Sequence, residues 1–284
     1  MYQAALCLGL SGTFGLPEAE QIRALRQIGF EGFFVNWTPG TDLSALRAVG
    51  DECGMIFQSV HAPFAKMADM WGKDEPKARI AIDELCTCLT DTAEAGVPIM
   101  IIHPFIGFED HTPTEEGLRH YGEVIDLAET LGVKLAFENV EGEEYLAALM
   151  ARFGDRACVG FCWDTGHEMC YNHSKDMLAL YGDKLICTHI NDNLGIRDYH
   201  GNITWIDDLH LLPFDGAGDW GGIVRRLNAH GYNGILTFEL TRASKPDRHE
   251  NDGYAAMEPI AYLTEAYKRA CRVATMKLAD AKNS

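Results

Sequence analysis

The stretch TEEGLRHYGEVIDLAETLGVKLAFENV, residues 114–140, carries the pattern that decides the fold. Thr114–Leu131 opens with a threonine and two glutamates, as a capped helix does. Gly132 follows at the position where a glycine commonly ends a helix. Lys134–Val140 is then a nearly continuous apolar run, which is typical of a strand buried on both faces. An acidic residue, Glu138, lies late in that run.

The order of helix, glycine and hydrophobic strand recurs along the chain. Glycines fall between a helix and the next strand at Gly29, Gly54, Gly96, Gly132 and Gly231. Further helices are expected at Glu18–Ile28, Pro76–Ala95 and about Tyr254–Val273. We expect eight strands, at Ala4–Leu10, Gly32–Trp37, Ile56–Ala62, Ile99–Pro104, Lys134–Val140, Val159–Asp164, Leu185–Asn191 and Gly234–Leu240. Eight strand–helix units predict an α/β protein that is a single (β/α)8 TIM barrel over residues 1–284.

The alternative α/β architecture is a doubly wound sheet, which usually carries a glycine-rich phosphate loop after its first strand. The corresponding segment here, Ser11–Gly15, has neither a GxGxxG pattern nor a Walker A lysine. No linker, low-complexity tract or change of composition marks a second domain. These observations favour the barrel.

Composition limits the classes of partner. The 284 residues carry a formal net charge of −18, and nucleic-acid backbones are held mainly by Lys and Arg. We therefore expect a small-molecule substrate and no nucleic acid. Nine cysteines, without a CxxC pair, are read as reduced thiols of a cytoplasmic protein. No apolar run approaches the roughly 20 residues that span a bilayer, so no membrane contact is expected.

Metal-ligating or proton-transferring residues end most of the expected strands. Parallel strands of a barrel place their C-terminal ends on one face, so these side chains should converge there. Carboxylates with imidazole suit Mn²⁺, Zn²⁺, Co²⁺ or Mg²⁺. Three carboxylates with one imidazole favour Mn²⁺ or Mg²⁺, whereas a further imidazole would favour Zn²⁺. The residues are His61, His103, Glu138, Asp164, His167, His189 and Glu239.

The motifs SVHAP, IIHP, FENVEG, WDTGH, THIND and TFEL, in this order, resemble the xylose isomerase-like barrel superfamily. That superfamily includes sugar and sugar-phosphate isomerases and epimerases, inosose-type dehydratases, and abasic-site nucleases of the endonuclease IV class. The resemblance implies one divalent metal, with Mn²⁺ the first expectation, held by Glu138, Asp164, His189 and Glu239. It also implies that Glu138 and Glu239 exchange the substrate proton, and that His167 contacts the sugar.

The expected reaction is isomerisation or epimerisation of a small sugar, sugar phosphate or polyol ketone. Removing a proton next to a carbonyl leaves an enediolate, which a divalent metal ion stabilises as a Lewis acid. A carboxylate on each face of the carbon can remove the proton from one side and return it on the other. A dehydratase would use the same first step and then expel water.

The resemblance leaves a hydrolytic alternative. The nuclease branch uses additional ligands that match His61, His103, Asp208 and His210, so ligand identity does not exclude a phosphoesterase with two or three metals. Many isomerase-branch relatives also keep the extra histidines, where they contact the substrate or support the metal ligands. His61, His103, Asp208 and His210 are therefore candidates for substrate binding or for a second metal. The net charge of −18 argues against binding of a DNA duplex. An acidic barrel of this kind also suits a homo-oligomer.

The long irregular stretch after the seventh strand, residues 191–218, is expected to act as a lid. It contains Arg197, which is either a phosphate or sugar ligand or a solvated surface charge. The family's His-x-x-Pro-Gly-x-Gly loop has two extra residues here, between Pro213 and Gly216. Aromatic residues near strand ends are candidates for an apolar wall, with ordinary packing the equal alternative: Phe14, Trp37, Phe64, Trp71, Phe105 and Trp163.

Overall fold

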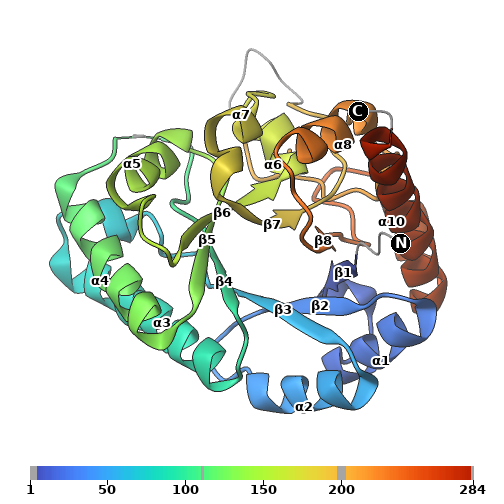
Figure 1. Ribbon diagram of the computed structural model, residues 1–284, viewed down its shortest axis with the longest axis horizontal. Helices are drawn as coiled ribbons and strands as arrows, with labels where there is room; N and C mark the ends of the chain where they lie inside the picture. The colour runs from blue at the N-terminus through green and yellow to red at the C-terminus, as the bar shows by residue number, and fades with distance from the viewer. Residues whose placement is uncertain (1–4, 110–111, 197–202, 283–284) are drawn as a thin grey trace.

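The structure is a computed structural model that describes residues 5–109, 112–196 and 203–282. Eight parallel strands form a nearly closed barrel, and helices lie between them around the outside (Figure 1). The strands are β1 Leu6–Gly9, β2 Gly32–Asn36, β3 Ile56–His61, β4 Ile99–Ile102, β5 Lys134–Glu138, β6 Val159–Asp164, β7 Leu185–His189 and β8 Leu236–Phe238. The predicted single (β/α)8 barrel is confirmed.

The strands follow one another around the barrel in chain order, and β1 pairs with β8. The ring closes where the chain just beyond β7 meets β8. There, the Ile190 amide donates to the Thr237 carbonyl at 2.8 Å, and the Glu239 amide donates to the Ile190 carbonyl at 3.3 Å. This closure brings Glu239 next to the end of β7.

The helices connect the strands on the outer surface. The α-helices are α1 Glu18–Ile28, α2 Leu43–Cys53, α3 Glu75–Glu94, α4 Glu115–Leu131, α5 Glu143–Phe153, α6 Thr165–Cys170, α7 Met177–Tyr181, α8 Trp220–Ala229, α9 Asp252–Ala255 and α10 Pro259–Ala281. Short 3₁₀ helices are η1 Gly12–Phe14, η2 Asp69–Trp71 and η3 Gly182–Lys184. The final helix, α10, begins and ends later than the sequence pattern predicts.

The capping residues and glycines predicted from the sequence lie at the helix ends in the structure. Thr114 Oγ1 accepts a hydrogen bond from the Gly117 amide at 3.0 Å and caps α4, as predicted. Gly132 ends that helix with a φ of 71°, a conformation that glycine adopts without a Cβ penalty. The other four glycines predicted to follow helices also have positive φ. The apolar runs locate all eight strands, but some of the predicted strands are too long. The strand β8 spans Leu236–Phe238, whereas the prediction was Gly234–Leu240.

The apolar core has two parts, one outside the ring of strands and one inside it. The larger one packs the outer faces of the strands against the helices. The smaller one fills the barrel interior and consists of Ile101, Ala136, Cys162 and Cys187. The nine cysteines are free.

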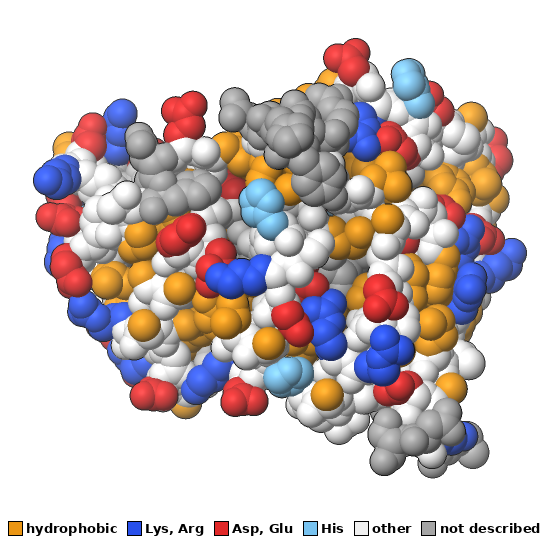
Figure 2. Space-filling view, turned by 90° about the horizontal axis from the view of Figure 1, so that it is seen from above, with side chains coloured by type: hydrophobic (Ala, Val, Ile, Leu, Met, Phe, Trp, Pro, Cys, Tyr) orange, Lys and Arg blue, Asp and Glu red, His pale blue; other side chains and the backbone are white. Residues whose placement is uncertain are grey.

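On the face shown in Figure 2, acidic and basic side chains are interspersed with apolar ones. Within the described residues, no helix is both long and apolar enough to span a membrane.

Candidate metal centre and its cavity

Four neighbouring strand ends deliver the residues predicted to ligate a metal. Glu138, Asp164 and His189 are the last residues of β5, β6 and β7, and Glu239 directly follows β8. Each of the four offers one ligand atom, and these atoms lie within 4.8 Å of one another. The first three residues are fully buried, whereas the Glu239 side chain is 21% exposed.

His189 lies at the centre of this group. Its Nδ1 atom is 2.9 Å from Glu138 Oε1 and 2.9 Å from Glu239 Oε2. Its ring stacks on Phe34 at a centroid distance of 4.7 Å, which holds its orientation. One ring nitrogen carries at most one proton, so two carboxylates converge on a single donor. A divalent cation among these atoms would neutralise the charge of both carboxylates. Carboxylate and imidazole ligands are ones that Mn²⁺ and Zn²⁺ bind.

Asp164 adds a third carboxylate and is held rigidly. Its Oδ1 accepts a hydrogen bond from the His167 amide at 2.6 Å, and its Oδ2 accepts one from Asn191 Nδ2 at 2.9 Å. Burial raises the pKa of Asp164 to about 6, and the neighbouring Glu138 and Glu239 carboxylates contribute to the increase. In the metal-free protein, the Asp164 carboxylate is therefore repelled by the two glutamates, and a bound cation would offset this repulsion.

The protein's own charges partly compensate the two glutamates. Burial acts to raise the pKa of Glu138, but His189, with a contribution from His103, holds it well below its usual range. The pKa of Glu239 is lowered to about 2 against the effect of burial, by His189 and His210. Despite burial, the pKa of His189 lies well above its usual value because of Glu138 and Glu239. A metal that binds here therefore competes with a proton on His189.

Two further histidines face the other oxygen of Glu138. The Nε2 atoms of His61 and His103 each lie 3.3 Å from Glu138 Oε2, a buried atom without a hydrogen-bond partner among the described residues. His61 Nδ1 lies 2.8 Å from the Ala62 carbonyl and donates a hydrogen bond to it. Burial lowers the pKa of His103, which favours its neutral form. This group also fits a cation.

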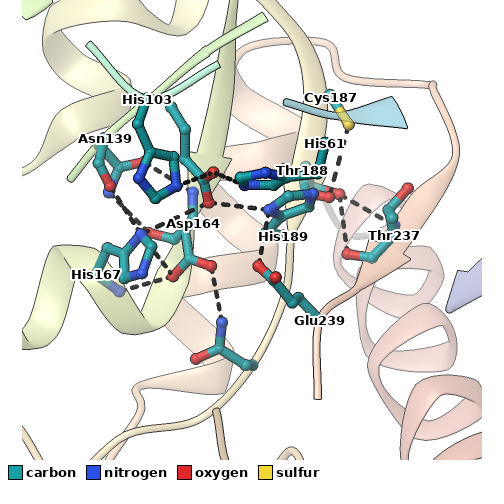
Figure 3. Close-up of polar contacts among 12 residues, drawn as sticks. His61, His103, Asn139, Asp164, His167, Cys187, Thr188, His189, Thr237 and Glu239 are labelled. Carbon is teal, nitrogen blue, oxygen red and sulfur yellow. Dashed lines mark hydrogen bonds and ion pairs between the residues drawn. The ribbon is translucent and has the colours of Figure 1, made fainter. Parts of the chain in front are cut away.

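A third group lies nearer the rim. His210 Nε2 is 2.8 Å from Asp208 Oδ2, and His167 Nε2 is 3.6 Å from Asp208 Oδ1. Figure 3 shows His61, His103, His167, His189, Asp164 and Glu239 turned toward a common region. The fold thus brings together nine of the ten residues singled out in the sequence. The tenth, Arg197, lies outside the described residues.

A cavity of about 380 Å³ opens above these groups. His61, His103, His167, Asp208, His210 and Glu239 contribute to its lining. Among the aromatic candidates for an apolar wall, Phe64 lines the cavity, whereas Phe14, Trp37, Trp71, Phe105 and Trp163 pack in the hydrophobic core. The other large apolar and aromatic side chains of the wall are ones that the sequence pattern did not place there: Ile106, Phe108, Tyr171 and Trp205. They lie on loops and on the turn after α6, where periodicity carries no signal.

The loop after β7 is anchored by a residue that sequence reasoning missed. Asp192 is fully buried and accepts hydrogen bonds from the amides of Asn193, Phe214 and Gly218, each at 2.9 Å, and from Trp220 Nε1 at 3.0 Å. An acid three residues after the end of β7 was the available signal. Closure of residues 191–218 as a lid stays a prediction.

The two-residue insertion after Pro213 points away from the cavity. Asp215 Oδ1 pairs with Arg269 of α10 at 2.9 Å, and its Oδ2 accepts a hydrogen bond from Tyr254. The guanidinium of Arg272 lies 3.8 Å from the centroid of the Phe214 ring. The insertion therefore braces the loop against α10, and neither of its residues lines the cavity.

The chain belongs to the xylose isomerase-like TIM barrel family, whose model matches residues 19–265. The uncharacterized protein y4fM of Sinorhizobium fredii is 28% identical over 256 residues, 76% of this chain and 78% of that protein. Inosose dehydratase of Bacillus licheniformis is 29% identical over 149 residues, 48% of each chain. The structure of an L-ribulose 3-epimerase shares the fold, with a TM-score of 0.73, 16% identity, and coverage of 99% of this chain and 97% of that one.

Proposed function

We propose that the protein is a divalent-metal-dependent isomerase or epimerase of a small sugar, sugar phosphate or polyol ketone. The observation that carries the proposal is the convergence of Glu138 and Glu239 on one nitrogen of His189 beneath the cavity. Glu138, Asp164, His189 and Glu239 would hold the metal. We propose Mn²⁺ first, with Zn²⁺, Co²⁺ or Mg²⁺ as alternatives.

When bound, the cation supplies Lewis-acid stabilisation of the negative charge that develops next to the reacting carbon. Glu239 lines the cavity and keeps a low pKa, so it is ionised at neutral pH and can accept a substrate proton. Glu138 is fully buried below it. A transfer on one face requires only Glu239, whereas epimerisation requires Glu138 to act from the other side.

The comparisons support a sugar-directed reaction more than hydrolysis of a phosphate ester. The fold neighbour named above acts on a ketose, and the net charge of −18 disfavours a nucleic-acid substrate. Dehydration of a cyclic polyol ketone stays the alternative, since the matched inosose dehydratase covers 48% of each chain. That reaction shares the proton abstraction and differs in the product mass, which falls by one water.

The test is solvent exchange. The protein is incubated in D₂O with Mn²⁺ and a panel of ketoses, ketose phosphates and inososes, and the products are examined by mass spectrometry. We expect metal-dependent incorporation of one deuterium next to the carbonyl, abolished by EDTA. Glu239→Gln should slow this exchange about 10²- to 10⁴-fold while metal stays bound.

The matched control is Glu94→Gln, an exposed acid at the end of α3, which should leave exchange unchanged. Full turnover of Glu239→Gln with metal bound would refute the proton-transfer role. Absence of exchange with every panel member, together with cleavage of a phosphate ester, would support hydrolysis instead.

A further inference from the structure

Asn139 connects residues of the candidate metal centre without lining the cavity above it. It directly follows Glu138 in the chain, and it is fully buried. Its polar atoms contact Asp164 and His167 (Figure 3). Because Asn139 does not contribute to the cavity wall, any effect that it has on the reaction passes through these neighbours.

The side chain of Asn139 binds both backbone polar groups of Asp164. Asn139 Oδ1 accepts a hydrogen bond from the Asp164 amide at 2.7 Å, and Asn139 Nδ2 donates to the Asp164 carbonyl at 2.9 Å. The register of β5 and β6 extends to the pair Glu138 and Cys162, two residues before Asp164. The Asn139 side chain therefore continues the pairing of the two strands up to the residue that carries the predicted ligand.

A second buried asparagine fixes the orientation of this amide. Asn139 Nδ2 also donates to Asn172 Oδ1 at 2.9 Å, and Asn172 Nδ2 donates to the Val140 carbonyl at 2.9 Å. A side-chain amide has two N–H donors, so both donors of Asn139 are used. Exchanging its oxygen and nitrogen would lose both contacts with Asp164, so one orientation is strongly favoured.

His167 is held by the backbone of the same residue. Its Nδ1 donates to the Asn139 carbonyl at 3.0 Å. Two carboxylate oxygens lie farther from this nitrogen, Glu138 Oε1 at 3.5 Å and Asp164 Oδ1 at 3.9 Å. The carbonyl thus gives the His167 proton an acceptor that is not a predicted metal ligand. Both carboxylates then stay available to a cation.

The contacts of Asp164 and of Asn139 complement each other. The His167 amide and Asn191 orient the Asp164 carboxylate relative to its own backbone. Asn139 fixes that backbone relative to Glu138, its neighbour in the chain. Residues that orient metal ligands in this way typically change metal affinity or activity about 10- to 100-fold when they are replaced.

We infer that Asn139 is a positioning residue for the metal centre. Its side chain holds Asp164 and Glu138 at a spacing that suits a divalent cation, and its carbonyl keeps His167 from occupying either carboxylate. Asn172 supports the Asn139 amide from the side opposite Asp164. The inference rests on the proposed function, since it concerns the metal site of that function.

The test measures metal affinity directly. The Kd for Mn²⁺ is determined by competition with a chelator, and the visible spectrum of the Co²⁺-loaded protein reports ligand geometry. Asn139→Ala removes all three hydrogen bonds of the side chain, whereas Asn172→Ala leaves both contacts with Asp164 intact. The control is Asn228→Ala, which removes two hydrogen bonds between α8 and α10 on the outside of the barrel.

We expect Asn139→Ala to raise the Kd about 10- to 100-fold and Asn172→Ala to raise it about threefold. Asn228→Ala should keep the Kd and the Co²⁺ spectrum of wild type. At saturating Mn²⁺, Asn139→Ala should lower kcat for deuterium exchange about tenfold and change KM less than about threefold, because Asn139 does not touch the substrate.

A purely structural role for Asn139 gives a different result. If Asn139→Ala lowers the free energy of unfolding but keeps the wild-type Kd and Co²⁺ spectrum, the inference is wrong. If that variant does not fold, Asn172→Ala decides, and an unchanged Kd refutes the inference. A wild type that binds Mn²⁺ but exchanges no deuterium contradicts the proposed function alone, and the Kd values still decide. A wild type that binds no metal refutes both.

Discussion

Strands β6 and β7 carry two layers of side chains that differ sharply in chemistry. Asp164 pairs in register with His189 at the strand ends, and Cys162 pairs with Cys187 two residues earlier. Residues two apart on a strand point to the same face, so both pairs face the barrel interior. The upper layer is charged and carries the predicted metal ligands, whereas the lower layer consists of two cysteine side chains.

The difference shows that the position of a residue along the strand determines whether its side chain can be charged. The lower layer is fully buried in an apolar cluster with Ile101 and Ala136. Burial there raises the pKa of Cys162 well above its usual value and keeps it protonated. The upper layer adjoins the cavity, where a cation and a substrate can compensate buried charge.

The largest expected effect separates the two layers directly. His189→Ala should abolish stoichiometric metal binding and lower deuterium exchange by about 10³-fold or more, because a metal ligand is lost. Cys187→Ala, two residues earlier on β7, should keep metal and exchange, and lower the free energy of unfolding by about 1 kcal/mol. Metal content by elemental analysis and exchange by mass spectrometry check both. Loss of metal in Cys187→Ala would break the distinction.

A smaller effect is expected where buried charge is satisfied by hydrogen bonds instead of a cation. Asp192→Ala should lower the free energy of unfolding by about 3 kcal/mol, because it removes four hydrogen bonds that anchor the loop after β7. Asp219→Ala, an exposed cap of α8, should cost about 1 kcal/mol. Denaturation with and without Mn²⁺ measures both. A loss for Asp192→Ala that disappears when metal is added would contradict this view.

The smallest effect concerns pH. Asp208 and Glu239 raise the pKa of His210 to about 9 against the effect of burial. A raised pKa stabilises the fold below the unfolded value near 6.5, and this contribution is lost as pH rises through about 9. Metal-free protein should therefore lose this contribution to its free energy of unfolding progressively between about pH 6.5 and 10.

The control for the pH experiment is His210→Gln, which removes the titrating group. Its unfolding free energy should decline less over the same pH range than that of wild type. Parallel pH profiles for the two proteins would show that His210 does not contribute.

Much of the site could be predicted from the sequence, because the C-terminal ends of parallel barrel strands lie on one face. Ligand-type residues at those ends must therefore lie close together. Glu138, Asp164, His189 and Glu239 needed only the correct strand assignment to be placed together. The helices α2, α5, α6, α7 and α8 received no bounds from the sequence pattern. Short helices and loops have weaker periodicity than buried strands.

Residues on loops could not be placed in the same way. Lys245 and Trp205 are 40 positions apart by their numbers, and they meet because the loops after β7 and β8 are neighbours at the rim. The aromatic residues of the wall were chosen by nearness to strand ends. Most of those aromatics turned out to belong to the core, since side-chain direction depends on packing that no local pattern encodes.

The sequence by itself determined the barrel and the residues at its strand ends. Hydrophobic runs, helix-capping residues and glycines after helices act on neighbouring residues, so their effect does not depend on distant contacts. Only the tertiary structure decided which oxygens and nitrogens of those residues meet, and which loop residues close the cavity. Those contacts depend on barrel closure and on long-range packing, which join positions far apart in the chain.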